Sequence, residues 1–280
     1  FGYLYVLNGV NKNDINNYLN RNKIIPIVNS IQNLEEIKSL KINIQIGIHI
    51  DTGINRLGIS IDDLNKFKNN KNIIITLVLS HFASADEKNN PYNYKQLKTF
   101  EEITNKYFKY KLKSMSNSAG LTLNKKKIYQ LTRPGIAIYG GHNNTILKKK
   151  IKPVVKLKAK ILQIKEINKN EFVGYNQIFC SKKKMIIAII SIGYADGILR
   201  QLSNKGYVYY KKCNFKIIGR ISMDTLTIDI TSNAKLLKVG MLVDLINYEN
   251  DIEKLAKSCG TISNEILTSI SNRVKRIYKH

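Results

Sequence analysis

The sequence predicts an α/β fold: an incomplete (β/α)8 TIM-type barrel domain over residues 1–150, followed by a mostly β domain over residues 151–280. In the first part, short apolar segments alternate with amphipathic helical segments, a pattern typical of βαβ units and a parallel sheet. In the second part, apolar segments follow one another with only turns between them. The pattern changes at Ile151-Lys152-Pro153, which is therefore the predicted domain boundary.

The first domain contains about six strand–helix units, whereas a closed barrel needs eight. The two absent units are the first two, at the N-terminal end of the barrel. Asn13-Asp14 is an N-cap candidate for the first helix, and Asp62 and Asp63 stand in the first turn of the third. An open doubly wound sheet is the alternative, although no Gly-x-Gly-x-x-Gly motif follows the first strand. The predicted strands are residues 4–7, 25–28, 46–50, 74–79, 112–115 and 136–139, and the predicted helices are residues 14–20, 34–39, 60–68 and 94–107.

The second domain is predicted from β-rich segments that are separated by polar turns such as Asn168-Lys169-Asn170 and Asn204-Lys205-Gly206. Two helices are predicted to follow these segments, over residues 252–258 and 263–272. Because no helices interrupt the β-rich segments, the domain is expected to be mostly β. Its predicted strands are residues 154–167, 185–192, 207–210, 215–218, 227–230 and 242–246.

The formal net charge of +26 raises the question of a nucleic-acid partner. The excess includes short, separated lysine runs at apparent turns, at residues 125–127, 148–150 and 182–184. Aromatic residues do not interleave with these runs in the manner that stacks bases, and no nucleic-acid motif is present. We therefore expect a solvated basic surface, with neither nucleic acid nor a membrane as a partner.

The remaining composition narrows the class of protein. No apolar run approaches the roughly 18 residues of a membrane helix, and the first residues, Phe1-Gly2-Tyr3, do not resemble a signal peptide. Cys180, Cys213 and Cys259 are widely spread, with no Cys-x-x-Cys pair and no nearby His. We therefore expect no metal site and no disulfide framework, and a cytoplasmic location with reduced thiols fits best.

Polar residues stand after several of the predicted strands. In a parallel barrel, the carboxyl ends of the strands face the active site, so these side chains are expected to gather there. They are His49, Asp51 and Arg56 after the third strand, His81 after the fourth, Asn117 and Ser118 after the fifth, and Arg133 before the sixth.

The segment Arg133-Pro134-Gly135 suits an anionic ligand. Gly135 permits a close approach of the backbone, so the amides of Gly135 and Ile136 can point at phosphate oxygens. Ser118 offers a hydroxyl for the same group, and an Arg held by a following Pro places a fork-shaped donor at a fixed acceptor. The alternative is a β-turn with a solvated Arg.

Seven motifs stand along the chain in an order shared with one enzyme family. They are Asp51-Thr52-Gly53-Ile54-Asn55-Arg56-Leu57-Gly58, Ser80-His81-Phe82-Ala83-Ser84-Ala85-Asp86, Asn117-Ser118-Ala119, Arg133-Pro134-Gly135-Ile136-Ala137-Ile138-Tyr139-Gly140, Gly193-Tyr194-Ala195-Asp196-Gly197, Met223-Asp224 and Arg273-Val274-Lys275-Arg276-Ile277-Tyr278. In these motifs the chain resembles the pyridoxal-phosphate (PLP) alanine racemases over nearly its whole length. The resemblance implies a PLP barrel domain plus a β domain, paired as a homodimer whose active sites are shared between subunits.

The resemblance also implies which residues hold the cofactor. His81 and Asn117 lie at the cofactor, with His81 packed against the pyridine ring. Arg133 donates to the pyridine nitrogen, which limits the cofactor as an electron sink and favours reversible proton transfer over transamination. The phosphate is held by Ser118, by the amides of Gly135 and Ile136, and by Tyr278.

For the reaction itself, the resemblance implies that Tyr194 is one of two bases that move the α-proton. Arg56 and the Met223 amide meet the substrate carboxylate, and Asp224 supports the Met223 loop. Tyr194 and Met223 act in the site of the partner subunit. His81 and Arg56 each have a structural alternative: a packed histidine, and an arginine that bonds within its own loop.

Three features depart from the family. No Lys-centred strand ending followed by a Tyr a turn later occurs, so we expect the PLP lysine to lie upstream of Phe1, and an unclosed sheet with poor stability without it. His49 stands where many members have a carbamylated Lys, and a neutral His49 ring is expected to accept a hydrogen bond from Arg56. Ile54 and Ser222 replace a frequent Met and Cys, both conservatively.

The predicted function is the interconversion of L-alanine and D-alanine, which supplies D-alanine for peptidoglycan. The alternatives are a serine or broad-specificity racemase of the same fold, or an inactive truncated remnant without the PLP lysine. A decarboxylase of the same architecture is disfavoured, because it needs a carboxylate at the pyridine nitrogen rather than Arg133.

Overall fold

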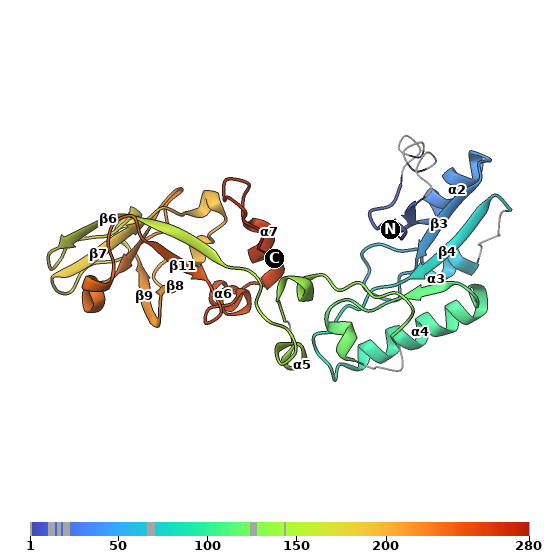
Figure 1. The fold of residues 1–280 in the computed structure, drawn as a ribbon. Helices are drawn as coiled ribbons and strands as arrows, with labels where there is room; N and C mark the ends of the chain where they lie inside the picture. Colours follow the sequence, from blue (N-terminus) through green and yellow to red (C-terminus); the bar gives the residue numbers. More distant parts are fainter. Residues whose placement is uncertain are drawn as a thin grey trace. The chain divides into compact units, whose positions relative to one another are not determined.

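The structure, a computed structural model, divides the chain into two compact units (Figure 1). The N-terminal unit comprises Phe1–Gly135 and Asn144–Leu147, and the C-terminal unit comprises Ile136–Asn143 and Lys148–His280. The predicted helix over residues 14–20, with its Asn13-Asp14 cap, and the lysine run at 125–127 fall largely or wholly outside the described residues. The described residues are 2–10, 15, 18, 23–65, 71–123, 128–142 and 144–279.

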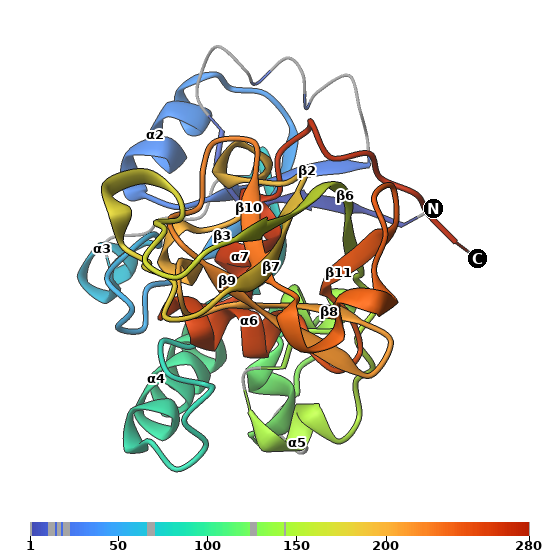
Figure 2. The ribbon, with the colours of Figure 1, turned by 90° about the vertical axis from the view of Figure 1, so that its left-hand side faces the viewer.

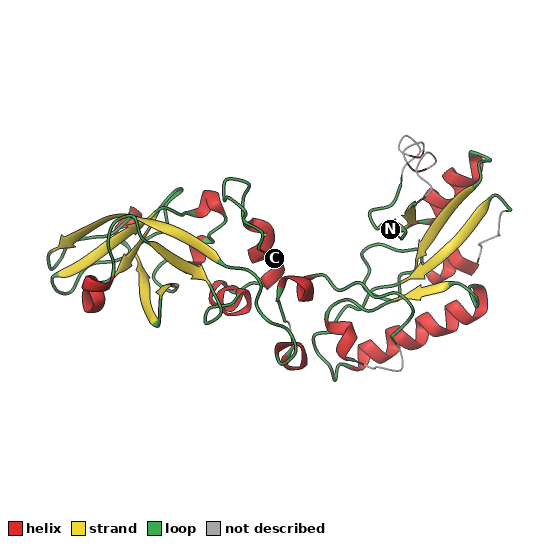
Figure 3. Ribbon diagram, viewed as in Figure 1, coloured by secondary structure: helices red, strands yellow, loops and turns green. Residues whose placement is uncertain are grey.

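The N-terminal unit is built on a parallel sheet of five strands in the order β1-β2-β3-β4-β5. Figure 3 shows strands and helices in this unit in separate colours. Neighbours in the sequence are also neighbours in the sheet, as repeated βαβ units dictate. This arrangement is the predicted incomplete barrel: a parallel half-barrel. The strands are β1 (Leu4–Val6), β2 (Ile24–Val28), β3 (Ile44–His49), β4 (Ile73–Leu79) and β5 (Leu112–Ser114).

Helices α2 (Ile31–Ser39), α3 (Ile61–Asn65) and α4 (Pro91–Tyr107) connect the later strands. Ser30 caps α2 by accepting from the Asn33 amide at 3.1 Å, and Asn90 caps α4, which begins with Pro91. Apolar residues of α4 recur every three or four positions and pack on the sheet, with Phe100 fully buried in the same core as Ile46.

The predicted strand over residues 136–139 is wrong: Ile136–Tyr139 is a 3-10 helix, η3. The strand-like pairing occurs slightly earlier, where Leu131 forms a parallel bridge with Ser114 and the Arg133 amide donates to the Ser116 carbonyl at 2.9 Å. Pro134 then ends the pairing, because it has no N–H to donate. The Arg133 side chain therefore leaves from the end of an extended segment, beside β5.

The C-terminal unit is a closed barrel of six strands in the order β10-β7-β6-β11-β8-β9. These strands are labelled in Figure 2. Antiparallel pairs join these strands all the way round. Alternate residues point inward, so that Ala188, Ile190, Val208 and Ile228 lie in one buried core. The strands are β6 (Leu157–Ile167), β7 (Met185–Ile190), β8 (Tyr207–Tyr210), β9 (Cys213–Ile218), β10 (Leu226–Asp229) and β11 (Leu242–Ile246).

The predicted strands of this unit are confirmed to within three residues at each end, and the two predicted helices are α6 (Ile252–Cys259) and α7 (Ser263–Ser269). A short helix, α5 (Thr145–Lys148), lies where the chain passes between the two units. None of the helices in the described part of the chain is long and apolar enough to cross a membrane. The remaining 3-10 helices are η1 (Ala119–Thr122), η4 (Tyr175–Gln177), η5 (Tyr194–Asp196), η6 (Arg200–Leu202) and η7 (Thr231–Leu236).

Candidate active site

Arg133 is the centre of a polar cluster at the carboxyl ends of the parallel strands. Its guanidinium donates to the Ser114 hydroxyl at the end of β5 and to the Ser80 carbonyl after β4 at 2.5 Å. Burial lowers the pKa of Arg133 to about 10, which leaves the group charged near neutral pH. The alternative of a solvated turn residue is therefore wrong for Arg133.

His81 lies between Arg133 and Asn117. Its Nδ1 is 3.4 Å from an Arg133 terminal nitrogen, and its Nε2 is 3.3 Å from the Asn117 amide nitrogen. The Asn117 amide oxygen accepts from the Gly120 N–H at 2.9 Å, which fixes the orientation of that side chain. Burial first, and then the charges of Arg133 and Arg56, lower the pKa of His81 to about 4, so the ring is neutral near pH 7.

A second contact brings together the residues predicted for a phosphate. The buried Ser118 hydroxyl accepts from the Gly135 amide at 3.0 Å. A Cβ added to Gly135 would meet no atom within 4 Å, so the backbone here is open to a ligand. Ser118 and Gly135 thus present a hydroxyl and an amide at one point, next in the chain to Arg133 and Ile136.

The loop that carries His81 is held by buried polar residues that the sequence did not single out. Gln96, on the core face of α4, donates to the His81 carbonyl at 3.0 Å and accepts from the Ala83 amide at 2.9 Å. Thr52 and Ser80 share a hydrogen bond of 2.7 Å between their hydroxyls. The sequence could have identified Gln96, because it is a polar residue at a helical position where the spacing predicts an apolar one.

His49 does not interact with Arg56 as expected. Its Nδ1 is 2.8 Å from the Asn29 amide oxygen, and its Nε2 has no hydrogen-bond partner among the described residues. Burial first, and then the charges of Arg133 and His81, lower the pKa of His49 to about 4. Arg56 is exposed, and the described residues offer its side chain no hydrogen bond, so bonding within its own loop is also not observed.

Asp51 holds the loop that presents Arg56. One carboxylate oxygen accepts from the amides of Gly53 at 2.8 Å, Ile54 at 3.0 Å and Asn55 at 3.2 Å. Gly53 has a φ of +124°, which a residue with a side chain rarely adopts. The Asp51-Thr52-Gly53 motif is therefore a turn built around one carboxylate.

In the C-terminal unit, two loops with site candidates run side by side. The Tyr194 amide donates to the Ser222 carbonyl and the Ala195 amide to the Met223 carbonyl, both at 3.0 Å. A Cβ on Gly193 would meet the Met223 carbonyl oxygen at 2.3 Å, so only glycine permits this approach. Tyr194 and Met223 are 42% and 53% exposed, so their side chains point outward.

Charged residues flank these two loops. Arg273 donates to Asp224 at 2.6 Å and lies 3.6 Å from Asp196 of the Tyr194 loop, so it ties both loops to the closing segment of the chain. The Arg200 guanidinium lies 5.8 Å from the Tyr194 ring centroid. A cavity of about 610 Å³ beside Tyr194 is also lined by Arg200.

Two further predicted residues, Tyr278 and Ile136, belong to the C-terminal unit. Tyr278 is 83% exposed in the C-terminal unit, and Ile136 is buried there at the start of η3. Within the described part of the chain, no group of three or more His, Cys, Asp or Glu residues is arranged to hold a metal ion.

Comparison with known proteins places both units in one family. The family model for the N-terminal domain of alanine racemase matches residues 2–143, and the model for its C-terminal domain matches residues 154–278. The alanine racemase of Brucella abortus is 35% identical over 98% of this chain and 74% of its own length. That of Rickettsia bellii is 35% identical over 98% of this chain and 69% of its own length.

Solved structures give the same result. Alanine racemase from Bartonella henselae, with covalently bound pyridoxal phosphate, superimposes with a TM-score of 0.92 at 34% identity, over 99% of this chain and 79% of that one. Alanine racemase from Bacillus anthracis, with bound L-Ala-P, gives a TM-score of 0.83 at 29% identity, over 96% and 74% of the two chains. The chain described here belongs to the alanine racemase family.

Proposed function

We propose that this chain catalyses the PLP-dependent interconversion of L-alanine and D-alanine in the cytoplasm, and so supplies D-alanine for peptidoglycan. The observation that carries the proposal is the cluster of Arg133, His81 and Asn117 beside the Ser118–Gly135 contact. Family membership supports the same reaction.

The residues present fit PLP. A charged Arg133 and a neutral His81 suit a flat ring that carries a ring nitrogen, because the cation opposes protonation of that nitrogen. The open backbone at Gly135 and the Ser118 hydroxyl suit a phosphate. When bound, PLP supplies electron withdrawal from the α-carbon of the amino acid.

Each residue then has a proposed task. Arg133 faces the pyridine nitrogen, and His81, oriented by Asn117, packs against the ring. The phosphate is held by Ser118, the amides of Gly135 and Ile136, and Tyr278.

The remaining residues act on the substrate. Tyr194 removes or returns the α-proton on one face, and Arg56 and the Met223 amide bind the substrate carboxylate. Asp224, paired with Arg273, holds the Met223 loop. We propose that Tyr194 and Met223 complete the site of the second subunit in a homodimer, because their exposed side chains are available to another molecule.

We also propose that the lysine that binds PLP covalently lies outside residues 1–280, because no Lys-centred strand ending like that of the family occurs among them. Borohydride reduction of the native protein followed by intact-mass and peptide analysis locates the adduct. An adduct on a lysine within residues 1–280 would refute this part of the proposal.

The reaction is tested by incubating the purified protein with L-alanine, L-serine and PLP and separating the enantiomers by chiral chromatography. D-alanine formation faster than D-serine formation is expected. Preference for serine would indicate the serine or broad-specificity alternative. No racemisation and no PLP adduct would indicate the inactive remnant.

A further inference from the structure

The segment that follows the predicted phosphate site is folded onto the C-terminal unit. Gly135 belongs to the N-terminal unit, and Ile136–Asn143 belongs to the C-terminal unit. Ile136 is buried in the core of that unit with Leu157 and Ile252. The Gly141 amide donates to the Ile136 carbonyl at 3.0 Å, which closes the turn that begins at Ile136.

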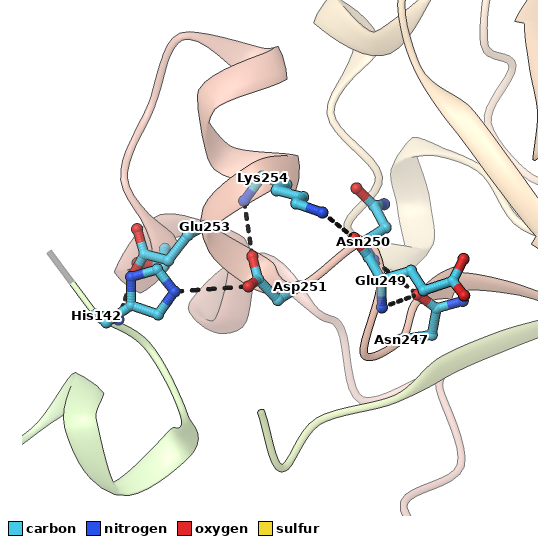
Figure 4. A network of polar contacts seen from close by, with 8 residues as sticks. His142, Asn247, Glu249, Asn250, Asp251, Glu253 and Lys254 are labelled. Atoms are coloured by element: carbon cyan, nitrogen blue, oxygen red, sulfur yellow. Dashed lines mark hydrogen bonds and ion pairs between the residues drawn. The ribbon is translucent and has the colours of Figure 1, made fainter. Parts of the chain in front are cut away.

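Glu253 fastens the other end of this turn. Its Oε1 accepts from the His142 amide at 2.7 Å and also from the Ser263 hydroxyl. Figure 4 shows Glu253 and Asp251 on one side of α6, both beside His142. Asp251 lies 3.5 Å from His142 Nε2 and caps α6 through the Lys254 amide. A carboxylate at Glu253 also suits the first turn of a helix.

There is no room for a side chain at Gly141. A Cβ at Gly141 would meet Ile136 Cγ1 at 2.4 Å and Glu253 Oε1 at 3.2 Å. Gly141 therefore lies between the Ile136 side chain and the Glu253 carboxylate. A movement of Glu253 would release Gly141 and, through it, the position of Ile136.

We propose that Glu253 is a positioning residue for the cofactor phosphate, because it holds the turn that presents the Ile136 amide beside Gly135. This inference rests on the proposed PLP function. Glu253 acts through the backbone: a carboxylate in contact with the phosphate would repel it.

The test compares PLP with pyridoxal, which lacks the phosphate, on the apo form of the whole protein. Glu253→Ala is expected to weaken PLP binding about five- to tenfold, the factor that corresponds to one lost hydrogen bond, while pyridoxal binding is unchanged. Glu253→Gln keeps the oxygen acceptor and is expected to restore most of the PLP affinity. Glu249→Ala is the matched control, because only the backbone carbonyl of Glu249 bonds to Lys254.

Hydrogen exchange gives a readout that does not depend on the cofactor. The His142 and Gly141 amides are expected to exchange faster in Glu253→Ala than in Glu249→Ala. If Glu253→Ala does not fold, Gly141→Ala carries the test, since its Cβ displaces Ile136 or Glu253 and should give the same loss of PLP affinity relative to pyridoxal.

The outcomes separate the two claims. If the unsubstituted protein does not bind PLP, the proposed function and this inference both fail. If the unsubstituted protein binds PLP, two results would overturn only the role of Glu253. In one, Glu253→Ala weakens the binding of PLP and of pyridoxal equally; in the other, it weakens the binding of neither.

Discussion

The two units place their candidate site residues in opposite environments. In the N-terminal unit, Ser80 and Ser114 are almost completely buried beside Arg133, and Ser118 is almost completely buried beside Gly135. In the C-terminal unit, Tyr194, Met223 and Tyr278 have exposed side chains, and backbone hydrogen bonds join the loops that carry Tyr194 and Met223. The first arrangement is organised before any ligand arrives, whereas the second presents groups that another molecule must meet. This difference supports the proposed division between holding the cofactor and completing a neighbouring site.

The sheets of the two units differ in a related way. The barrel of the C-terminal unit closes through the β9–β10 pair, so every strand has two neighbours. In the described part of the N-terminal unit, β1 pairs only with β2. An unpaired edge is a site of fraying and association, so the N-terminal unit is expected to be the less stable of the two.

The largest effect is expected from a substitution at Tyr194, one of the exposed site candidates of the C-terminal unit. Tyr194→Phe is expected to lower kcat for racemisation by about 10²–10⁴-fold, the range for losing a general base, while the unfolding midpoint stays unchanged. Chiral chromatography measures the rate. Mixing this variant with Arg133→Leu should restore activity if sites are shared between subunits, and an unchanged kcat would remove Tyr194 from the mechanism.

Matched core truncations test whether the two units unfold separately. Phe100→Ala in the N-terminal unit and Phe215→Ala in the C-terminal unit each remove a buried ring and should cost about 3–5 kcal/mol. Urea unfolding followed by hydrogen exchange should show each loss confined to its own unit. A single transition shifted equally by both variants would contradict this independence.

Acid should weaken the N-terminal unit through its buried histidines. The folded pKa of His49 is about 4, below its ordinary 6.5, so its contribution is complete above pH 6.5 and is lost as pH falls from 6.5 to 4. Between pH 7 and pH 5 this loss is about 2 kcal/mol. His49→Gln, which cannot titrate, should show a correspondingly smaller loss in urea titrations at the two pH values, and an equal loss would exclude His49 as the cause.

The smallest expected effect compares helix caps. Ser30→Ala removes one side-chain acceptor from α2 and should cost about 1 kcal/mol. Asp251→Ala removes the cap of α6 together with the His142 contact and should cost more. Thermal denaturation of the two variants measures the difference; equal costs would mean that the His142 contact contributes nothing to stability.

The sequence predicted what depends on local pattern. Strands β8 and β11 match their predicted ranges because turns bound them on both sides. The placement of His81, Arg133 and Ser118 at strand ends followed from the parallel pattern. By contrast, Ile136–Tyr139 looks like a strand from its apolar residues, whereas it is a 3-10 helix whose Ile136 and Ala137 carbonyls accept from the Gly141 and Gly140 amides.

What sequence reasoning missed depends on distant contacts. Gln96 reaches Thr52 across 44 positions, and Arg273 reaches Asp224 across 49. His49 turns to Asn29 rather than to Arg56, a choice that two neighbouring strands decide and that no motif contains. Such pairings are fixed by packing of the whole unit, which local periodicity does not encode.

The path of the chain between the units has a consequence for how the protein is made. Ile136 and His142 are synthesised with the N-terminal unit, yet the carboxylate that fixes His142 comes 111 residues later. During synthesis, Ile136 cannot pack against Ile252 until α6 has left the ribosome. The turn from Ile136 to His142 therefore forms late in synthesis, and a protein begun at Lys148 would lack a segment that contributes to the core of its own unit.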